Sequence, residues 1–257
     1  MTSAQWDAFR TFRDEFKAKC LEWSELQEML FPLQRAASQA DTPLYPLENA
    51  VVYSRDFDTL TPQDDIKLIV IGDNPGKDEQ LHKNRRYLVG QAGKIAEGFF
   101  RRNPELGIDF RKHVLILNKT PVHTAKTAHL RKLLKEPTVY NLIQQSQCWM
   151  AQHTAVLHRQ LIAGAAPETP RDMLPAIWLV GYAELKGRGL FISYRNKLLE
   201  GYHSAAADFS DHVFVYQHFS MNRFLIDLSN FRKEYPELTL SEALHELGSL
   251  HRTEIFC

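Results

Sequence analysis

The chain has 257 residues, of which 44% are hydrophobic and 24% are charged, and its formal net charge at pH 7 is zero. These values indicate a globular protein with a sizeable core and exclude a low-complexity chain. Because the amino terminus lacks an apolar signal region and no run of eighteen apolar residues occurs, we expect a soluble, cytoplasmic protein with no membrane partner.

The three cysteines, Cys20, Cys148 and Cys257, lie far apart and are odd in number. This pattern predicts neither a disulfide framework nor a metal site of the Cys-x-x-Cys type. We therefore expect reduced thiols, no metal and no cofactor.

Charge is distributed unevenly along the chain. Residues 1–65 carry a net charge of −6, whereas residues 83–135 carry 13 basic and 3 acidic side chains, a net charge of +10. Such a basic block attracts nucleic acid, because each neutralised phosphate releases counterions. A solvated helix face explains the same charges equally well. If the acidic segment lies near the basic one, it is expected to weaken DNA binding.

The first 65 residues read as a helical arm that packs on the core. Apolar spacing predicts two helices within residues 4–40, separated by a break near Cys20, and Pro43 and Pro46 then end regular structure. Residues 66–257 form the predicted main domain, and we expect the protein to be monomeric.

Four apolar runs of strand length follow, at 67–72, 113–117, 176–181 and 213–216. Helical patterns separate them at 93–102, 138–161 and 196–203, with more helix after Ser220. This alternation predicts an α/β fold with three layers, α/β/α, around a central, mostly parallel four-stranded sheet. In such sheets ligands bind at the carboxyl ends of the strands.

Polar side chains follow three of the four predicted strands. The first run ends in Gly72-Asp73-Asn74-Pro75-Gly76, the second in Asn118-Lys119-Thr120-Pro121, and the fourth is followed by His218. A carboxylate that orients water, an amide that reads hydrogen-bonding groups and an imidazole that stabilises a developing anion form a hydrolytic set. We predict that Asp73, Asn74, Asn118 and His218 converge on one pocket.

Three motifs in this order resemble the uracil-DNA glycosylase superfamily. They are Gly72 to Gly76 after the first strand, Val89-Gly90-Gln91-Ala92-Gly93 opening a helix, and His218-Phe219-Ser220 after the last strand. The first loop is most similar to the branch whose motif is Gly-Glu-Ala-Pro-Gly. The resemblance covers roughly residues 66–230.

This resemblance implies base-excision repair: hydrolysis of the N-glycosidic bond of uracil, or of a related deaminated base, flipped out of DNA. It implies catalytic roles for Asp73 or Asn74 with water and for His218 with the base carbonyl. The substrate-binding residues implied by the resemblance are Gly72, Pro75, Gly76, Tyr87, Leu88, Asn118 and Phe219. Those implied to bind DNA are Gly90, Gly93, Lys94, Ser220, Met221, Asn222 and Arg223.

The chain departs from the family pattern at two positions. Phe219 replaces the proline of the His-Pro-Ser motif, and Leu88 stands where the similar branch has an aromatic residue that stacks on the base. Loss of one base–aromatic stack costs about 1–3 kcal/mol of binding free energy. Tyr87 or Phe219 is the candidate to stack on the base in place of that aromatic residue. The three cysteines also cannot supply the four iron–sulfur ligands of that branch.

Other interpretations remain open. Asp73 and Asn74 are residue types that cap turns, and a histidine at a strand end is often a core residue. A family fold that has lost catalysis would act as a nucleic-acid or nucleobase binding module. A small-molecule hydrolase or nucleotide-binding protein with the same sheet is the third class, although the glycine-rich nucleotide motifs are absent.

Overall fold

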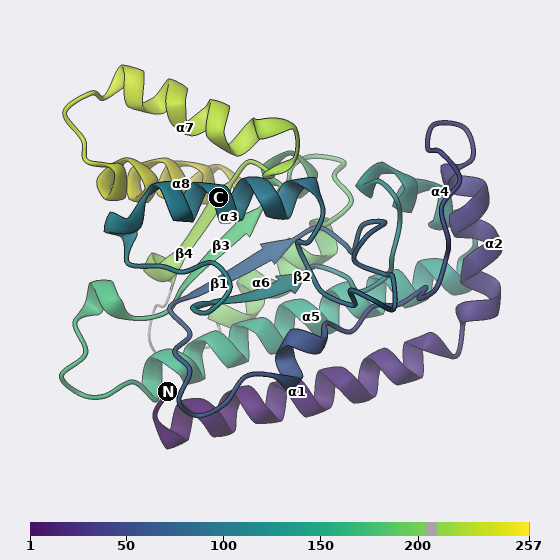
Figure 1. Ribbon diagram of the computed structural model, residues 1–257, viewed down its shortest axis with the longest axis horizontal. Helices are drawn as coiled ribbons and strands as arrows, with labels where there is room; N and C mark the ends of the chain where they lie inside the picture. Colours follow the sequence, from purple (N-terminus) through teal and green to yellow (C-terminus); the bar gives the residue numbers. More distant parts are fainter. Residues whose placement is uncertain (204–209, 257) are drawn as a thin grey trace.

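A computed structural model describes residues 1–203 and 210–256. The chain forms a central sheet of four parallel strands in the order β2-β1-β3-β4 (Figure 1). The strands are β1 (Leu68–Gly72), β2 (Val114–Asn118), β3 (Ala176–Val180) and β4 (Val213–Tyr216). The predicted α/β class and the four strands are confirmed, and the sheet is parallel throughout.

The strands form where short apolar runs are covered on both faces. All five residues of β1 are buried, as expected for an inner strand of a parallel sheet with helices on both sides. Strand β1 pairs with β2 on one side and β3 on the other. The carboxyl end of β1 therefore lies between the exits of β2 and β3.

Helices lie on both faces of the sheet. On one face are α3 (Gln91–Arg102), α7 (Arg223–Glu234) and α8 (Leu240–Phe256) (Figure 1). On the other are α5 (Pro137–Ala163) and α6 (Ile192–His203). Trp178 of β3 joins the sheet to the first group, since its ring centroid lies 5.3 Å from that of Phe100 and 5.8 Å from that of Phe224. Aromatic packing of this kind forms much of the core.

The amino-terminal arm begins with α1 (Ser3–Ser24), which lies along α5, and continues with α2 (Gln27–Ser38) (Figure 1). The predicted break near Cys20 is wrong, because α1 continues to Ser24. Cys20 shares the buried face of this helix with Phe12 and Phe16. The Phe16 ring stacks on Trp149 of α5 with centroids 5.6 Å apart, which holds α1 against the core.

The remaining helical segments are short. One α-helical turn, α4 (Leu130–Leu133), follows the exit of β2. The 3₁₀ helices are Arg55–Asp58, Pro104–Leu106, Thr127–His129, Arg171–Met173, Tyr182–Leu185, Ser210–His212 and Ser220–Asn222. No helix within residues 1–203 and 210–256 combines the length and apolarity needed to cross a bilayer.

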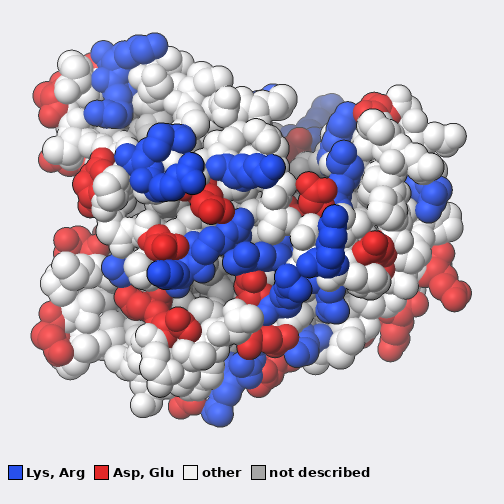
Figure 2. Space-filling model, viewed as in Figure 1, with Lys and Arg blue, Asp and Glu red and all other residues white. Residues whose placement is uncertain are grey.

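Basic side chains gather on one face of the molecule. Figure 2 shows Lys and Arg side chains across the middle of this face, over α3 and β2, with acidic side chains among them. Some of the basic groups from residues 83–135 are paired, including Arg86 with Asp56 at 2.6 Å and Lys126 with Asp41 at 3.1 Å. Both acidic partners belong to the amino-terminal arm. The arm therefore neutralises part of the basic block.

Candidate active site

The turn after β1 is built on a buried ion pair. Asp73 is 6% exposed, and its Oδ1 accepts a hydrogen bond from Lys119 Nζ at 2.6 Å. Lys119 has no exposed surface and also donates to the carbonyls of Val180 at 2.5 Å and Gly72 at 3.3 Å. Burial lowers the pKa of Lys119, and the charge of Asp73 opposes that shift. One ammonium group thus ties together the exits of β1, β2 and β3.

Gly181, directly after β3, lies against this ion pair. Its φ is +98°, a conformation that favours glycine, and a Cβ at this position would lie 2.4 Å from Asp73 Oδ1. The close approach covers Oδ1. The other oxygen, Oδ2, accepts from the Thr127 hydroxyl at 3.3 Å.

Asn74 is held with its amide nitrogen turned toward the segment after β2. Nδ2 donates to Thr124 Oγ1 at 2.9 Å and to the Val122 carbonyl at 3.3 Å. Because a carbonyl only accepts, these bonds fix which end of the amide faces Val122. Asn74 Oδ1 has no hydrogen-bond partner within residues 1–203 and 210–256. It is a fixed acceptor available to a water molecule.

Pro75 fixes the remainder of the turn. Its carbonyl accepts from the Thr124 backbone N–H at 3.2 Å and from His123 Nδ1 at 2.9 Å. His123 is buried, and burial lowers its pKa to about 4, so the ring is neutral at pH 7. Since Nδ1 must donate, Nε2 accepts, and Tyr45 of the arm lies 3.0 Å from it. The arm thereby supports the turn. Gly76, by contrast, has no close neighbour that would exclude a Cβ.

Asn118 ends β2 beside this turn. It is 3% exposed, and among the described residues its Nδ2 has no hydrogen-bond partner. Its Oδ1 lies so close to Gly72 that a Cβ on that residue would be 2.5 Å away. A buried donor without a partner costs about 1–3 kcal/mol, which a ligand acceptor would recover.

His218 follows β4 and is partly exposed. The Ser220 backbone N–H donates to its Nδ1 at 3.1 Å, and Ser220 Oγ lies 2.7 Å from the same atom. Since an N–H group only donates, Nδ1 must be the acceptor, and the neutral ring carries its proton on Nε2. Burial lowers the pKa of His218, Asp73 raises it, and Lys119 and Arg223 lower it. These charge effects connect His218 with the ion pair at the β1 exit.

The residues around His218 differ in exposure. Phe219 is fully buried, and its ring centroid lies 5.0 Å from that of Phe224, so the ring belongs to the core. Ser220, rather than a proline, restrains the imidazole.

Met221 is 69% exposed, and Met221 and Asn222 have left-handed φ values of +55° and +56°. Strained backbone of this kind is found at binding loops. Arg223 begins α7 and is exposed.

The segment that precedes α3 is also buried. Tyr87 has no exposed surface, and its hydroxyl donates to the Val52 carbonyl. Leu88 is 4% exposed with a φ of +50°, and its carbonyl accepts from Arg111 Nη2 at 2.5 Å. A Cβ on Gly93 would lie 1.6 Å from that carbonyl oxygen, so glycine is required there for packing. None of these side chains presents an exposed aromatic face.

Gly90 is the N-cap of α3 and provides no side-chain cap, which leaves the first backbone N–H groups of the helix without a side-chain acceptor. Lys94 lies one turn further on and is exposed. These features suit the phosphate contacts predicted here.

The structure thus brings Asp73, Asn74 and Asn118 to one edge of the sheet. Within the described residues no hydrogen bond or ion pair joins His218 to these three side chains, and the charges of Asp73 and Lys119 act on it only through its pKa. Sequence reasoning missed Lys119, Gly181 and Thr124. Lys119 had one signal, since it is a cation placed directly after a buried strand. No cluster of three potential metal ligands occurs in the described parts of the chain. Comparison with family models, with curated proteins and with solved structures gives no match for this chain.

Proposed function

We propose that the protein hydrolyses the N-glycosidic bond of uracil, or of a related deaminated base, flipped out of DNA. One observation carries the proposal. A neutral His218 with its proton on Nε2 acts in the same electrostatic environment as a turn whose Asn74 Oδ1 is a fixed acceptor. The resemblance of the three motifs to the uracil-DNA glycosylase superfamily, and the four-stranded parallel sheet, agree with it.

The contacts suggest separate roles for Asp73 and Asn74, the two catalytic candidates in the turn after β1. Asn74 Oδ1 orients the attacking water, because its amide is fixed and that oxygen has no partner in the described chain. Asp73 is committed through Oδ1 to Lys119, so it supports the turn and places a partly balanced negative charge beneath the reacting sugar. As the C1′–N bond breaks, its electron pair passes to the base, and the water oxygen bonds to C1′. The proton that this water releases neutralises the departing base anion.

The base itself is bound by two donors. His218 Nε2–H donates to the carbonyl oxygen that gains charge, an interaction worth about 3 kcal/mol in comparable oxyanion sites. Asn118 Nδ2, which is buried and unpartnered among the described residues, donates to an acceptor on the base edge. Met221 is exposed on a strained loop and fills the gap left in the base stack.

A second candidate function is binding without turnover. It is favoured by the burial of Tyr87, Leu88 and Phe219, because none of these side chains offers an aromatic face to a flipped base. A nucleobase would then be held by Asn118 and His218 with no stacking platform. This alternative predicts preference for uracil-containing DNA without excision.

The test is excision from a labelled oligonucleotide with one uracil, single- and double-stranded, followed by alkaline cleavage of abasic sites. Asn74→Ala and His218→Ala are expected to lower single-turnover rates about 10²–10³-fold. Asn196→Ala and His245→Ala, on exposed helix positions, are matched controls. An inactive parent that binds the uracil oligonucleotide more tightly than its thymine counterpart indicates the binding module. Neither excision nor preference refutes both functions.

A further inference from the structure

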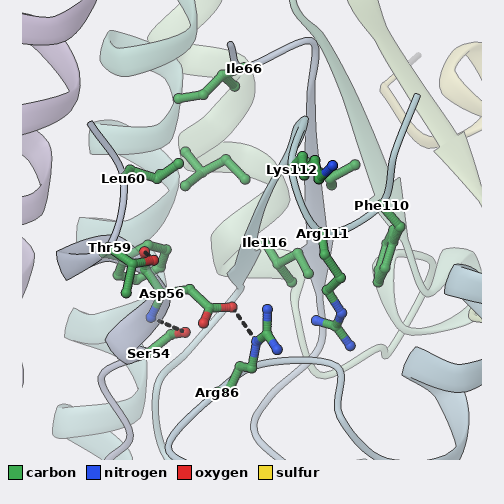
Figure 3. A pocket seen from close by; sticks show the side chains of 13 residues that line it. Ser54, Asp56, Thr59, Leu60, Ile66, Arg86, Phe110, Arg111, Lys112 and Ile116 are labelled. Atoms are coloured by element: carbon green, nitrogen blue, oxygen red, sulfur yellow. Dashed lines mark hydrogen bonds and ion pairs between the residues drawn. The ribbon is translucent and has the colours of Figure 1, made fainter. Parts of the chain in front are cut away.

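A polar cavity lies between the amino-terminal arm and the free edge of β2, and none of the candidate active-site residues lines it. Its volume is about 50 Å³, and Figure 3 shows Arg86, Arg111 and Lys112 around it together with Ser54 and Asp56. The volume corresponds to roughly three or four water positions or one tetrahedral oxyanion. Val114 and Ile116, which line it, are four and two residues before Asn118, so the cavity lies along β2 at about 7–13 Å from the carboxyl edge.

Two arginines face each other in this cavity. In Figure 3 the guanidinium groups of Arg86 and Arg111 point toward one another. Burial lowers the pKa of Arg111, and the charge of Arg86 lowers it further. The carboxylates of Glu97 and Asp56 oppose these effects, and they leave the three cations Arg86, Arg111 and Lys112 with an excess of one positive charge. A planar guanidinium pair is suited to a phosphate group.

The cavity retains donors that the protein does not use. Arg86 bonds to Asp56 through Nε, and neither of its terminal nitrogens has a partner within the described chain. Lys112 is exposed, and its ammonium likewise has no partner there. Arg111 differs, since three of its nitrogens are committed to Glu97, Tyr87 and Leu88.

The edge of β2 adds neutral donors. The His113 carbonyl accepts from the N–H groups of β1, so His113 and Leu115 face β1 while Val114 and Ile116 face outward. Val114 and Ile116 both line the cavity. Their backbone N–H groups alternate with carbonyls along this rim and have no partner among the described residues.

We propose that this cavity binds a phosphate group through Arg86, Lys112 and the outward edge of β2. The site is independent of base excision. Free phosphate compounds and nucleic-acid backbones share this chemistry, and the basic face around the cavity suits either source. Asp56 competes with the anion for Arg86, so its carboxylate sets the affinity.

The first arm of the test is calorimetric titration of the full chain with inorganic phosphate. The double variant Arg86→Gln/Lys112→Gln is expected to bind at least about tenfold more weakly. The control Arg101→Gln/Lys135→Gln removes two exposed cations of the same basic block that do not line the cavity, and is expected to match the parent. Asp56→Asn is expected to tighten binding severalfold, which loss of structure would not do.

The second arm replaces phosphate with a short oligonucleotide that carries no lesion. If the double variant weakens both ligands, the site takes backbone phosphates; if it weakens phosphate alone, the site takes free phosphate compounds. The proposal is overturned if the double variant and the control bind phosphate equally, or if Asp56→Asn does not tighten binding. Excision activity is not a readout in either arm, so failure of the glycosylase proposal is separate.

Discussion

The buried ion pair between Lys119 and Asp73 is expected to be important for the stability of the fold. Its ammonium is fully buried and paired with Asp73, and removing either partner leaves the other charge without compensation in the core. Lys119→Met and Asp73→Asn are each expected to lower the free energy of unfolding by about 3–5 kcal/mol. Denaturant unfolding of both, and of the double variant, checks this. We expect the double variant to be far more stable than additivity predicts; simple additivity would contradict the ion pair.

His158 gives a pH-dependent prediction at a single residue. Burial lowers its pKa to about 4, and both ring nitrogens are bonded, to Tyr202 and to the Pro175 carbonyl. Between its unfolded pKa of about 6.5 and pH 4, the unfolded chain binds one more proton than the folded chain. Stability therefore falls as pH falls, by about 2 kcal/mol from this residue between pH 6.5 and 5.

Denaturant unfolding at pH 7 and pH 5 measures this loss for the parent and for His158→Gln. The variant has no titrating ring, so its unfolding free energy is expected to change less between the two pH values. Burial also lowers the pKa of His123 to about 4. His123 therefore contributes a similar loss of stability in both proteins and serves as the internal background. An equal pH dependence in parent and variant would show that folding does not lower the pKa of His158.

At the scale of elements, Gly76 and Gly93 are predicted to differ in how much a substitution by alanine destabilises the protein. A Cβ on Gly93 would collide with the Leu88 carbonyl, whereas Gly76 has only Glu79 Oε1 nearby, at 3.8 Å. We expect Gly93→Ala to disrupt the junction between this loop and α3 and to lower the free energy of unfolding by more than about 2 kcal/mol. Gly76→Ala is expected to change it by less than about 1 kcal/mol. Thermal unfolding of the pair tests the contrast, and equal effects would refute it.

The loop before α3 also carries an acid with the opposite pH dependence. Burial raises the pKa of Glu79 to about 8, with weaker opposing hydrogen bonds from the backbones of Gly76 and Leu88. Above a pH of about 4.5 the unfolded chain releases the Glu79 proton, whereas the folded chain keeps it. The free energy of unfolding therefore falls as pH rises from about 4.5 to 8. Glu79→Gln is therefore expected to gain stability relative to the parent at pH 8 and not at pH 5. A constant difference between the two pH values would argue against a buried neutral acid.

Much of the element pattern was predictable, and the reason is periodicity. Each strand is an apolar run, helical patterns lie between the runs, and Pro43 ends regular structure because it has no backbone N–H to donate. The break placed near Cys20 failed because the apolar spacing was interrupted at Leu21, which is 69% exposed on a continuous helix. Local pattern does not reveal which face of a helix a neighbour will cover.

The candidate site was predictable only in part. Asp73, Asn74 and His218 follow the carboxyl ends of strands, where ligands bind in parallel α/β sheets. The ion pair to Lys119 and the close approach of Gly181 depend on strands that are adjacent only after folding. Phe219 and Tyr87 are aromatic residues near the site, and the sequence alone does not distinguish a stacking platform from a core ring.

For the whole molecule, the charge map sets the expected salt dependence of DNA binding. Of the 13 basic residues in 83–135, Lys119 is buried and Arg86, Arg111, Lys126 and Arg131 are paired with carboxylates, which leaves eight. Because each phosphate contact contributes about 0.9 to the slope of log K against log salt, we expect a slope no steeper than about −7. Titrations of a lesion-free duplex at several salt concentrations measure it. A slope near −11 would mean that the four pairs open on binding, because about twelve basic residues would then contact phosphates.

The pairing of β1 with both β2 and β3 has a consequence for biosynthesis. Register joins Leu68 to Val114 and also to Ala176, so the inner strand is made long before its second neighbour leaves the ribosome. Until Val180 emerges, the Lys119 ammonium lacks one of its acceptors, and the nascent turn holds a charge that the finished core compensates. Non-local pairing of this kind folds slowly and exposes strand edges meanwhile. The strands that are made first are accordingly expected to expose unpaired edges until β3 and β4 have been synthesised.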